Sequence, residues 1–428
     1  MTRTRGTGQI PQPSMEFTFG PFTFDASSSR LMRDNAEIRL RPQALQVLRV
    51  LLHHRGRPIP YEQMMAEAWQ GTFVSRHTID VTVGEVKKSL GEFGRWIVHR
   101  PKVGHSLEVP TSDELVRKGW HFASRRTKEG AERAIECFEQ AAMQCPTDFR
   151  AFAGSSTCYL MQATFGMRCP SEVYPKFLTA HERAVELGGL TPELRCNRAH
   201  GLHMFEHRSR DAESEFFQVL AERPAFATTH VRMALMYVTL GRLDRALEVL
   251  RQGYQADPLL PTLLPSEAIV HVWRREFDKA VAAGSKSVEL HPYLQISRAG
   301  YARALEFSGR LEEALTQYQL GSIMSGDLPW MRALEGTCLV KLGRTSEAHA
   351  ILDELEHRRD SEYADALYMA ALQDALGLRS EAFAELERAV DENSGFLYSI
   401  EVDPRFDTFR DDPRFRRVRD AAGEPVIA

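Results

Sequence analysis

Six alanines in the second half of the chain follow one another at intervals of 34 residues. These anchors are Ala212, Ala246, Ala280, Ala314, Ala348 and Ala382. Other small or turn-forming residues keep the same interval. Twelve positions before five of the anchors lie Ala234, Ala268, Ala302, Gly336 and Ala370, and five positions before them lie Gly241, Arg275, Gly309, Gly343 and Gly377. A fixed period of this length predicts an array of repeats, in which each unit buries its apolar face only against its neighbours.

The residue types at these positions indicate what each unit contains. Small residues at two positions let two helices approach closely, and glycine between them ends the first helix in a left-handed conformation without a Cβ penalty. Pro224, Pro258 and Pro292 lie twelve positions after three of the anchors, where a residue without a backbone N–H stops the second helix. The unit resembles the tetratricopeptide repeat, which is a helix, a tight turn and a second helix. The copy from Ala227 to Pro258 follows the pattern best.

Upstream of the first anchor the spacing of the repeats becomes irregular. Ala134 and Ala184 mark two earlier units with irregular spacing, and the stretch GMRCPSEVYP (residues 166–175) has the character of an insertion. We therefore expect about eight helical pairs over residues 111–394, the first two of them irregular, as is usual where an array begins.

A second motif lies beyond the last expected pair. DPRF occurs twice, at 403–406 and at 412–415, in a polar and charged segment. We predict that residues 395–428 cap the exposed end of the array. Its arginines could bind a ligand, but a solvated cap is the simpler interpretation.

Catalytic signatures are absent from the sequence of the array. There is no Gly-rich phosphate loop, no HExxH and no GxSxG. His200, His203 and His207 share one helical face, but no carboxylate or cysteine completes a metal-ligand set, so packing is the favoured interpretation. We expect no catalytic residue, no metal and no cofactor. Stacked repeats form a long concave groove, and the prediction is a surface for an unidentified protein or peptide, or for self-association.

Charge and cysteine usage narrow the class of protein further. The chain of 428 residues carries a net charge of −4, yet residues 1–110 hold 15 Lys and Arg against 10 Asp and Glu. Residues 1–110, the head of the chain, are thus basic and the remainder is acidic, which predicts that only the head binds a polyanion. No stretch of about 18 apolar residues could span a membrane, and the opening 14 residues lack the apolar core of a secretory signal. The six cysteines form no CxxC pair and indicate reduced, packed thiols. We therefore expect a cytoplasmic protein that does not contact a membrane.

The head follows a different pattern from the array. After an expected disordered tail (residues 1–14), residues 16–40 alternate apolar and polar side chains, as in a small antiparallel sheet with one buried face. A helix is predicted from Pro42 to near Gly56, a second from Tyr61 to Trp69, and a third from the capping residue Ser75 to Leu90. The alternation around 97–109 predicts a closing β-hairpin. This is the plan of a winged helix-turn-helix.

At this point the residues resemble a known family, the OmpR-like output domains of bacterial response regulators. The matching segments are FTFGPFTFD, LRPQALQVLRVLLHHRGRPIP, EAW, VSRHTIDVTVGEVKKSL and PKVGHSL, over about residues 15–110. A winged helix followed by tetratricopeptide repeats is similar to CadC-like and HilA-like transcriptional regulators, here without a transmembrane segment. The fold class is therefore expected to be mostly α, with a small α+β winged helix-turn-helix domain followed by an all-α tetratricopeptide-repeat superhelix.

Helical geometry assigns roles along the third helix. Ile79, Val83, Val86 and Leu90 recur at helical spacing and are predicted to face the core. In the family this helix enters the major groove of double-stranded DNA and the hairpin wing touches the adjacent backbone or the minor groove. The resemblance therefore implies a set of DNA-binding candidates on the helix and the wing, which are His77, Thr78, Val81, Gly84, Glu85, Lys87, Lys88, Arg100 and Lys102. It also implies RNA polymerase as a partner at the loop 70–74.

Two departures from the family pattern affect this interpretation. Gly84 and Glu85 stand in mid-helix where family members often carry two basic residues. Glycine there costs ~1 kcal/mol of helix stability relative to alanine, and a carboxylate facing phosphates is repulsive, although glutamate accepts a hydrogen bond from cytosine. His105 stands at the expected wing tip, where the family commonly has tyrosine. The phosphate contacts are therefore predicted to be fewer than usual.

Two functions from different classes fit these patterns. The first is a DNA-binding transcriptional regulator whose repeats bind a regulatory protein or ligand, or self-associate. The second is a non-enzymatic interaction scaffold whose winged helix has lost DNA binding, which Gly84 and Glu85 would permit. Salt-dependent affinity for DNA separates the two, because a protein that neutralises phosphates releases counterions.

Overall fold

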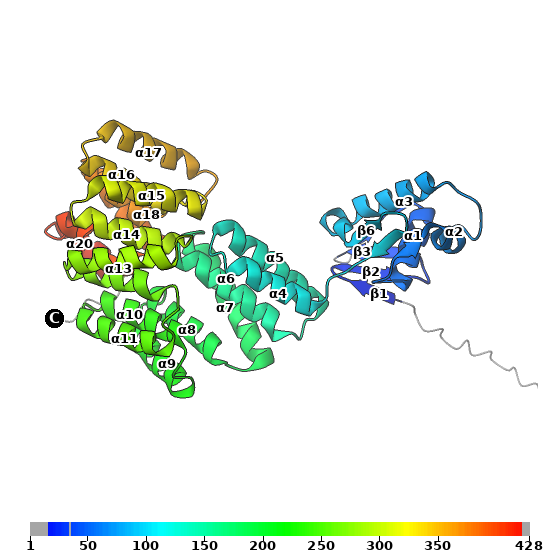
Figure 1. The fold of residues 1–428 in the computed structure, drawn as a ribbon, viewed down its shortest axis with the longest axis horizontal. Coiled ribbons are helices and arrows are strands. Elements are labelled where there is room, and N and C mark those ends of the chain that lie inside the picture. Colours follow the sequence, from blue (N-terminus) through cyan, green and yellow to red (C-terminus); the bar gives the residue numbers. More distant parts are fainter. Residues whose placement is uncertain (1–15, 34–35, 422–428) are drawn as a thin grey trace, which may run out of the picture. The chain divides into compact units, whose positions relative to one another are not determined.

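The computed structural model describes residues 16–33 and 36–421. The expected disordered tail, residues 1–14, lies outside the described residues. The chain forms two compact units, which are considered separately (Figure 1). The winged-helix unit comprises Met1–Arg117 with Glu139–Asp148, and the repeat unit comprises Lys118–Phe138 with Phe149–Ala428.

The winged-helix unit begins with a four-stranded antiparallel sheet. Its strands, in spatial order, are β1 (Glu16–Phe19), β2 (Phe22–Asp25), β3 (Arg30–Arg33) and β4 (Ala36–Ile38). Phe19, Phe22, Phe24 and Leu31 are buried, and Phe24 lies opposite Leu31 across the β2–β3 pair. The alternation of side chains thus places one face of the sheet on the core, as predicted.

Three helices and a second sheet complete this unit. The helices are α1 (Pro42–His53), α2 (Tyr61–Ala68) and α3 (Arg76–Ser89), followed by the 3-10 helix η1 (Gly91–Trp96). The second sheet has the order β5-β7-β6, formed by β5 (Ile59–Pro60), β6 (Ile97–Arg100) and β7 (Gly104–Leu107). The hairpin β6–β7 was predicted. The strand β5 was not, because two residues are too few to show an alternating pattern.

The core side of α3 is the one predicted from spacing. Ile79, Val83, Val86 and Leu90 are all at most 1% exposed. The Ser75 hydroxyl accepts a hydrogen bond from the Thr78 N–H at 3.1 Å, so this residue caps the helix as expected.

The rest of the described chain is almost entirely helical. Its helices are α4 (Ser112–Ala123), α5 (Lys128–Gln144), α6 (Phe149–Thr164), α7 (Pro170–Gly188), α8 (Pro192–Met204), α9 (Ser209–Glu222), α10 (Ala227–Thr239), α11 (Leu243–Ala256), α12 (Leu263–Trp273), α13 (Phe277–Leu290), α14 (Gln295–Phe307), α15 (Leu311–Ser325), α16 (Pro329–Lys341), α17 (Thr345–Arg358), α18 (Ala366–Ala375), α19 (Arg379–Asp391) and α20 (Pro413–Ala421). From α6 to α19, each even-numbered helix packs on the odd-numbered helix that follows it. The fold class is therefore mostly α, with a small α+β part followed by helical repeats, as predicted.

The periodic alanines occupy one structural position. Each of the six anchors is the fourth residue of an odd-numbered helix from α9 to α19, and all six are fully buried. The small residues twelve positions earlier lie in the even-numbered partners. At Gly336, a Cβ atom would come within 2.7 Å of a methyl group of Leu372. Leu372 lies in α18 of the next repeat, and Ile351 of the partner helix α17 would lie 3.5 Å away, so the 34-residue interval reflects close packing both within and between repeats.

The turn position that lacks glycine keeps the glycine conformation. Gly241, Gly309, Gly343 and Gly377 all have positive φ angles, and Arg275 in the corresponding turn has a φ of 62°. Such a conformation costs a residue with a side chain roughly 1 kcal/mol. The Arg275 guanidinium donates to both carboxylate oxygens of Asp407, at 2.9 and 3.1 Å, so it also attaches this turn to the C-terminal segment.

The repeat unit is held together by contacts between residues far apart in the sequence. The Asn393 side chain, after α19, donates to the Phe205 carbonyl oxygen at 2.9 Å. The Gln295 side chain donates to the carbonyl oxygen of Arg126. In the C-terminal segment, Phe406 and Phe409 are almost fully buried and belong to the same core as α14 to α19. These contacts bring the beginning and the end of the array onto its middle.

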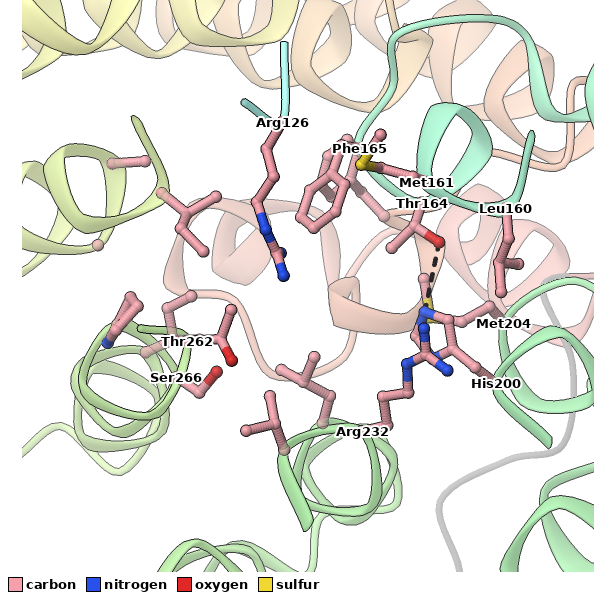
Figure 2. A pocket seen from close by; sticks show the side chains of 18 of the residues that line it. Arg126, Leu160, Met161, Thr164, Phe165, His200, Met204, Arg232, Thr262 and Ser266 are labelled. Carbon is pink, nitrogen blue, oxygen red and sulfur yellow. Dashed lines mark hydrogen bonds between the residues drawn. The ribbon is translucent and has the colours of Figure 1, made fainter. Parts of the chain in front are cut away.

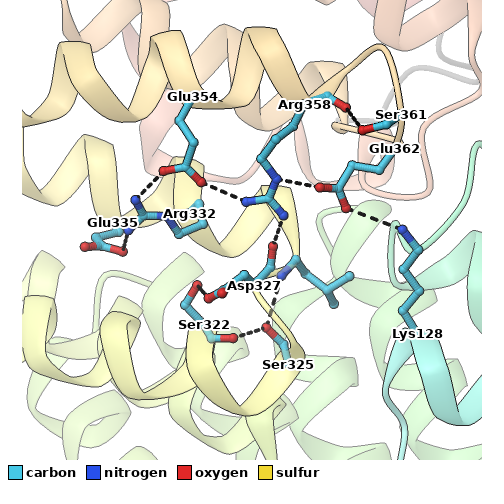
Figure 3. A network of polar contacts seen from close by, with 11 residues as sticks. Lys128, Ser322, Ser325, Asp327, Arg332, Glu335, Glu354, Arg358, Ser361 and Glu362 are labelled. Atoms are coloured by element: carbon cyan, nitrogen blue, oxygen red, sulfur yellow. Dashed lines mark hydrogen bonds and ion pairs between the residues drawn. The ribbon is translucent and has the colours of Figure 1, made fainter.

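A network of charged side chains adds to this closure (Figure 3). Arg332 of α16 and Arg358 of α17 both donate to Glu354, at 2.6 and 2.9 Å. Arg358 also donates to Glu362 at 2.5 Å, and the Lys128 ammonium lies 3.4 Å from the same carboxylate. Lys128 is the first residue of α5, so the network joins the start of the array to the turn between α17 and α18.

Candidate nucleic-acid interface

The solvent-facing side of α3 carries most of the predicted contact residues. His77, Thr78, Gly84 and Lys88 are exposed, and Val81 is 52% exposed although it is apolar. Glu85 and Lys87 are half-buried and flank this side. Because the opposite side of the helix fills the core, none of the exposed residues is needed to hold α3 in place. The helix therefore presents a polar face of about three turns to solvent.

The carboxylate in the middle of this helix is paired. Arg41, the residue before α1, donates its Nε–H to Glu85 at 2.8 Å and donates a second hydrogen bond from Nη2 to the same oxygen. This hydrogen bond lowers the pKa of Glu85 and also raises that of Arg41. The Arg41 side chain is 67% exposed, so the pair lies at the surface. The negative charge that seemed to disfavour phosphate contacts is thus balanced by a cation 44 positions away in the sequence.

The wing is the hairpin β6–β7, and its turn contains residues 101–103. Lys102 is exposed and adopts a left-handed conformation with a φ of 65°. Arg100 is also exposed, but it donates a hydrogen bond to Glu108 at 2.7 Å, which balances its charge. The expectation that His105 lies at the wing tip is wrong. His105 pairs with His99 within the sheet and is only 5% exposed.

A hydrogen-bonded cluster ties the wing to α3. The Asp80 carboxylate, on α3, lies 2.7 Å from His105 Nε2 and accepts the Tyr61 hydroxyl at 2.8 Å. The same hydroxyl lies 3.2 Å from His99 Nε2 on β6. Burial lowers the pKa of His105 more than Asp80 raises it, so His105 is neutral and donates its Nε2–H to the carboxylate. The cluster fixes the wing relative to the contact helix.

Two further exposed features adjoin the first turn of α3. The Arg76 guanidinium lies 5.2 Å from the centre of the Tyr61 ring, in a cation–π contact, and 3.8 Å from Glu62. In the loop before α3, Phe73 is 85% exposed, an unusual position for an aromatic ring. Arg76 adds a cation beside His77, and Phe73 gives the loop 70–74 an apolar contact point.

Replacing Gly84 by alanine is expected to raise the free energy of unfolding by ~1 kcal/mol, because glycine is a poor helix former. A Cβ atom at this position would meet no atom within 4 Å. Equilibrium urea unfolding monitored by circular dichroism measures the change. A loss of stability would contradict the open surroundings of Gly84.

Two of the three histidines that share a face in the array form hydrogen bonds with hydroxyl groups. His200 lies 3.3 Å from the Thr164 hydroxyl, and His203 contacts the hydroxyls of Ser209 and Thr239 at 3.0 and 3.2 Å. Among the described residues, no group of three or more His, Cys, Asp and Glu side chains is placed to hold a metal ion.

The burial of His203 predicts acid sensitivity of the array. Burial, together with the charge of His207, lowers the pKa of His203 to about 3. Because the folded-state value lies below the unfolded value of ~6.5, stability is lost as the pH falls below 6.5, by about 2 kcal/mol at pH 5. The variant His203→Gln should flatten this dependence in urea unfolding, while the exposed His357→Gln should not. Identical pH dependence in all three proteins would contradict the assignment.

Comparison with known proteins agrees with the geometry of the winged-helix unit. Residues 35–107 match the family described as "Transcriptional regulatory protein, C terminal". The chain carries an OmpR-type winged helix-turn-helix domain. This domain implies a DNA-binding transcriptional regulator, and the repeats that follow it are of the tetratricopeptide type. No catalytic domain was found. Every helix in the described part of the chain is too short or too polar to cross a membrane.

The repeats have structural relatives at low sequence identity. Human IFIT1, as a dimer with PPP-AAAA, is 16% identical, with coverage of 77% of this chain and 79% of that chain and a TM-score of 0.51. The human IFIT1 dimer with m7Gppp-AAAA is 15% identical, with coverage of 84% and 78% and a TM-score of 0.53. At these identities the likeness shows a shared helical-repeat fold alone.

Sequence reasoning missed some of the residues that shape this surface. Arg41, Arg76 and Asp80 were not among the predicted site residues. Arg76 carries a visible signal, because it is a cation one position from His77 at the start of the contact helix. Arg41 and Asp80 carry no such signal in the sequence, because Glu85 and His105, with which they pair, lie 44 and 25 positions away.

Proposed function

We propose that the protein is a transcriptional regulator whose helix α3 enters the major groove of promoter DNA. Val81 and Thr78 would contact base edges, with His77 beside them, and Gly84 would let the backbone approach the groove. Lys87 and Lys88 near the end of α3 would contact phosphates. The observation that supports this most is the exposed Val81 at the centre of a polar helix face that has no packing role.

The wing would supply the second contact. Lys102 at the hairpin turn would bind the phosphate backbone beside the groove. Arg100 would contribute less, because Glu108 already balances its charge. Asp80, through His105 and Tyr61, would act as a positioning residue that sets the distance between the two contacts.

The pairing of Glu85 with Arg41 favours this function over that of a scaffold that has lost DNA binding. In a phosphate-facing helix an unpaired carboxylate would oppose binding. Here Arg41 balances it, so the charge of Glu85 does not cancel that of Lys87, Lys88 and Lys102. Glu85 would also be able to accept a hydrogen bond from a cytosine amino group.

The repeats would receive the regulatory input. A protein or ligand in the concave groove, or a second copy of the chain, would change how the winged helix acts on DNA. We further propose that the loop 70–74, with Phe73 at its surface, contacts RNA polymerase.

Salt-dependent DNA binding by the full chain tests this proposal. We expect Lys88→Ala and Lys102→Ala each to weaken binding to genomic DNA fragments and to reduce the slope of log affinity against log salt by about 1, because each removes one phosphate contact. The variant Glu85→Gln should strengthen binding, because it releases Arg41 to the phosphates.

The matched control is Lys176→Ala, which removes an exposed lysine from α7 of the array and should leave affinity and slope unchanged. No salt-dependent affinity in the wild-type protein would overturn the regulator proposal and favour the scaffold. Wild-type slopes for both lysine variants would show that DNA contacts another face.

A further inference from the structure

The repeat unit contains a partly open cavity of about 360 Å³. Even-numbered helices from α4 to α18 line it, together with the C-terminal segment around Phe396. Ligand pockets for small organic molecules have volumes of roughly 300–1,000 Å³ and are mostly apolar. A space of this size suits a single small molecule better than a peptide or a folded partner.

Arginine side chains enter this cavity from three elements. Arg126 lies in the turn after α4 and has a φ of 54°, Arg232 lies on α10 and Arg303 on α14. Figure 2 shows Arg126 and Arg232 pointing into the same open space. The residues that line the cavity include no aspartate and no glutamate. The cavity therefore holds positive charge without a carboxylate in its own wall.

The hydrogen bonds of these arginines do not supply the missing negative charge. Arg232 donates to the Asn197 amide oxygen at 2.7 Å and to the sulfur of Cys196 at 3.3 Å, both neutral acceptors. Arg303 donates to the Tyr368 hydroxyl at 3.3 Å, and its buried Nε has no hydrogen-bond partner among the described residues. The charge of Arg303 acts on Asp403, but that carboxylate already forms an ion pair with Arg405.

The surroundings of Arg126 disfavour the charged form of its guanidinium. Burial, and then the neighbouring charge of Arg232, lower the pKa of its guanidinium. No described carboxylate forms an ion pair with Arg126 or Arg232 within 4.0 Å. Both residues are half-buried, and two partly desolvated cations directed into the same space cost free energy unless an anion lies between them.

The remaining wall suits an apolar and flat group. It includes the rings of Trp120, Phe165, Trp273, Trp330 and Phe396, and the side chain of Met161. The Trp330 indole N–H is buried and donates to no described acceptor. Figure 2 places the hydroxyls of Thr262 and Ser266 across the space from Thr164. The wall thus offers aromatic surface and hydrogen-bond donors together.

We propose that this cavity binds a small organic anion, a carboxylate or phosphate monoester on a flat apolar body, with Arg126 and Arg232 holding the anionic group. Charge-assisted hydrogen bonds from guanidinium to such groups are short and strong. The aromatic rings would cover the apolar body. This binding goes beyond the proposed contact with DNA and is measured without DNA, so either proposal can fail alone.

The test titrates the full chain with 8-anilinonaphthalene-1-sulfonate, an aromatic anion whose fluorescence rises in apolar sites. We expect saturable binding at one site. 1-Naphthoate or 1-naphthyl phosphate should displace the probe, and the stronger competitor identifies the anionic group. The uncharged 1-naphthamide should not displace it. Each of Arg126→Gln and Arg232→Gln should weaken probe binding about tenfold or more.

Two controls separate the site from general apolar binding and from misfolding. Arg251→Gln removes an exposed arginine from α11 and should bind the probe as the wild type does. Thr262→Trp keeps both arginines but fills the cavity, and should abolish binding. Without ligand, Arg126→Gln should melt at the wild-type temperature or higher, because an uncompensated, half-buried charge is removed. Unchanged probe affinity in both arginine variants, or equal competition by 1-naphthamide, would overturn the proposal.

Discussion

Replacing Arg405 by methionine is expected to lower the free energy of unfolding of the repeat unit by about 3–5 kcal/mol. Arg405 and Asp403 form an ion pair in which the two side chains are only 4% and 1% exposed. Burial alone would raise the pKa of Asp403, but Arg405, with Arg303 behind it, lowers it below the usual value. Without Arg405 the carboxylate stays buried with too little positive charge. Urea unfolding monitored by circular dichroism measures the loss.

The second copy of the same motif provides a matched control. Arg414 donates to Asp412 from Nε and Nη2, at 3.1 and 2.9 Å, as Arg405 does to Asp403. These side chains are 40% and 23% exposed, so water screens the pair. Arg414→Met should therefore cost under about 1 kcal/mol. Equal losses for the two arginines would show that burial does not distinguish the copies.

Replacing Gly104 by alanine is expected to disrupt the wing and abolish DNA binding. Gly104 has a φ of 154°, and a Cβ atom there would lie 1.9 Å from the Ile59 carbonyl oxygen, inside the β5–β7 pair. Relieving that clash requires the strands to separate. The expected loss of stability is about 3 kcal/mol or more, as for other strained backbone positions with steric conflict. Thermal unfolding and DNA binding of the full chain both report it.

The variant Gly91→Ala is a control that introduces the conformational strain without the steric clash. Gly91 also has a positive φ, of 59°, but a Cβ atom there would meet nothing within 4 Å. Gly91→Ala should cost only about 1 kcal/mol and retain DNA binding. If Gly104→Ala behaves like Gly91→Ala, the close approach of β5 and β7 is not as described.

The fold was largely predictable because its signals are local and periodic. The six alanine anchors mark a contact repeated in every unit, and the positions of Ile79, Val83 and Val86 identify the buried side of α3. Both patterns depend on spacing along one or two neighbouring helices. They hold without knowledge of what lies elsewhere in the chain.

The charged contacts were not predictable in the same way. Arg41 and Glu85 gave no sign of pairing, and His105 was placed at the surface although it is buried against Asp80. The DPRF motif looked solvated in both copies, yet Arg405 is buried and Arg414 is not. Each of these outcomes depends on which distant segments fold together. A single sequence does not contain that information.

The cavity of the repeat unit could not be predicted from the sequence for the same reason. Arg126 and Arg232 lie in a turn and in a helix 106 positions apart, and each alone resembles an ordinary surface arginine of a repeat. Only the closure of the array brings them to one space.

Photo-crosslinking from α3 tests the central claim most directly. p-Benzoylphenylalanine in place of Val81 in the full chain should crosslink to duplex DNA fragments that the protein has selected. The same substitution at Ile323, which is 72% exposed on α15, should not. Crosslinks at position 81 that low salt strengthens and high salt removes are the predicted result. Crosslinks at 323 with none at 81 would contradict the assignment of α3 as the helix that binds DNA.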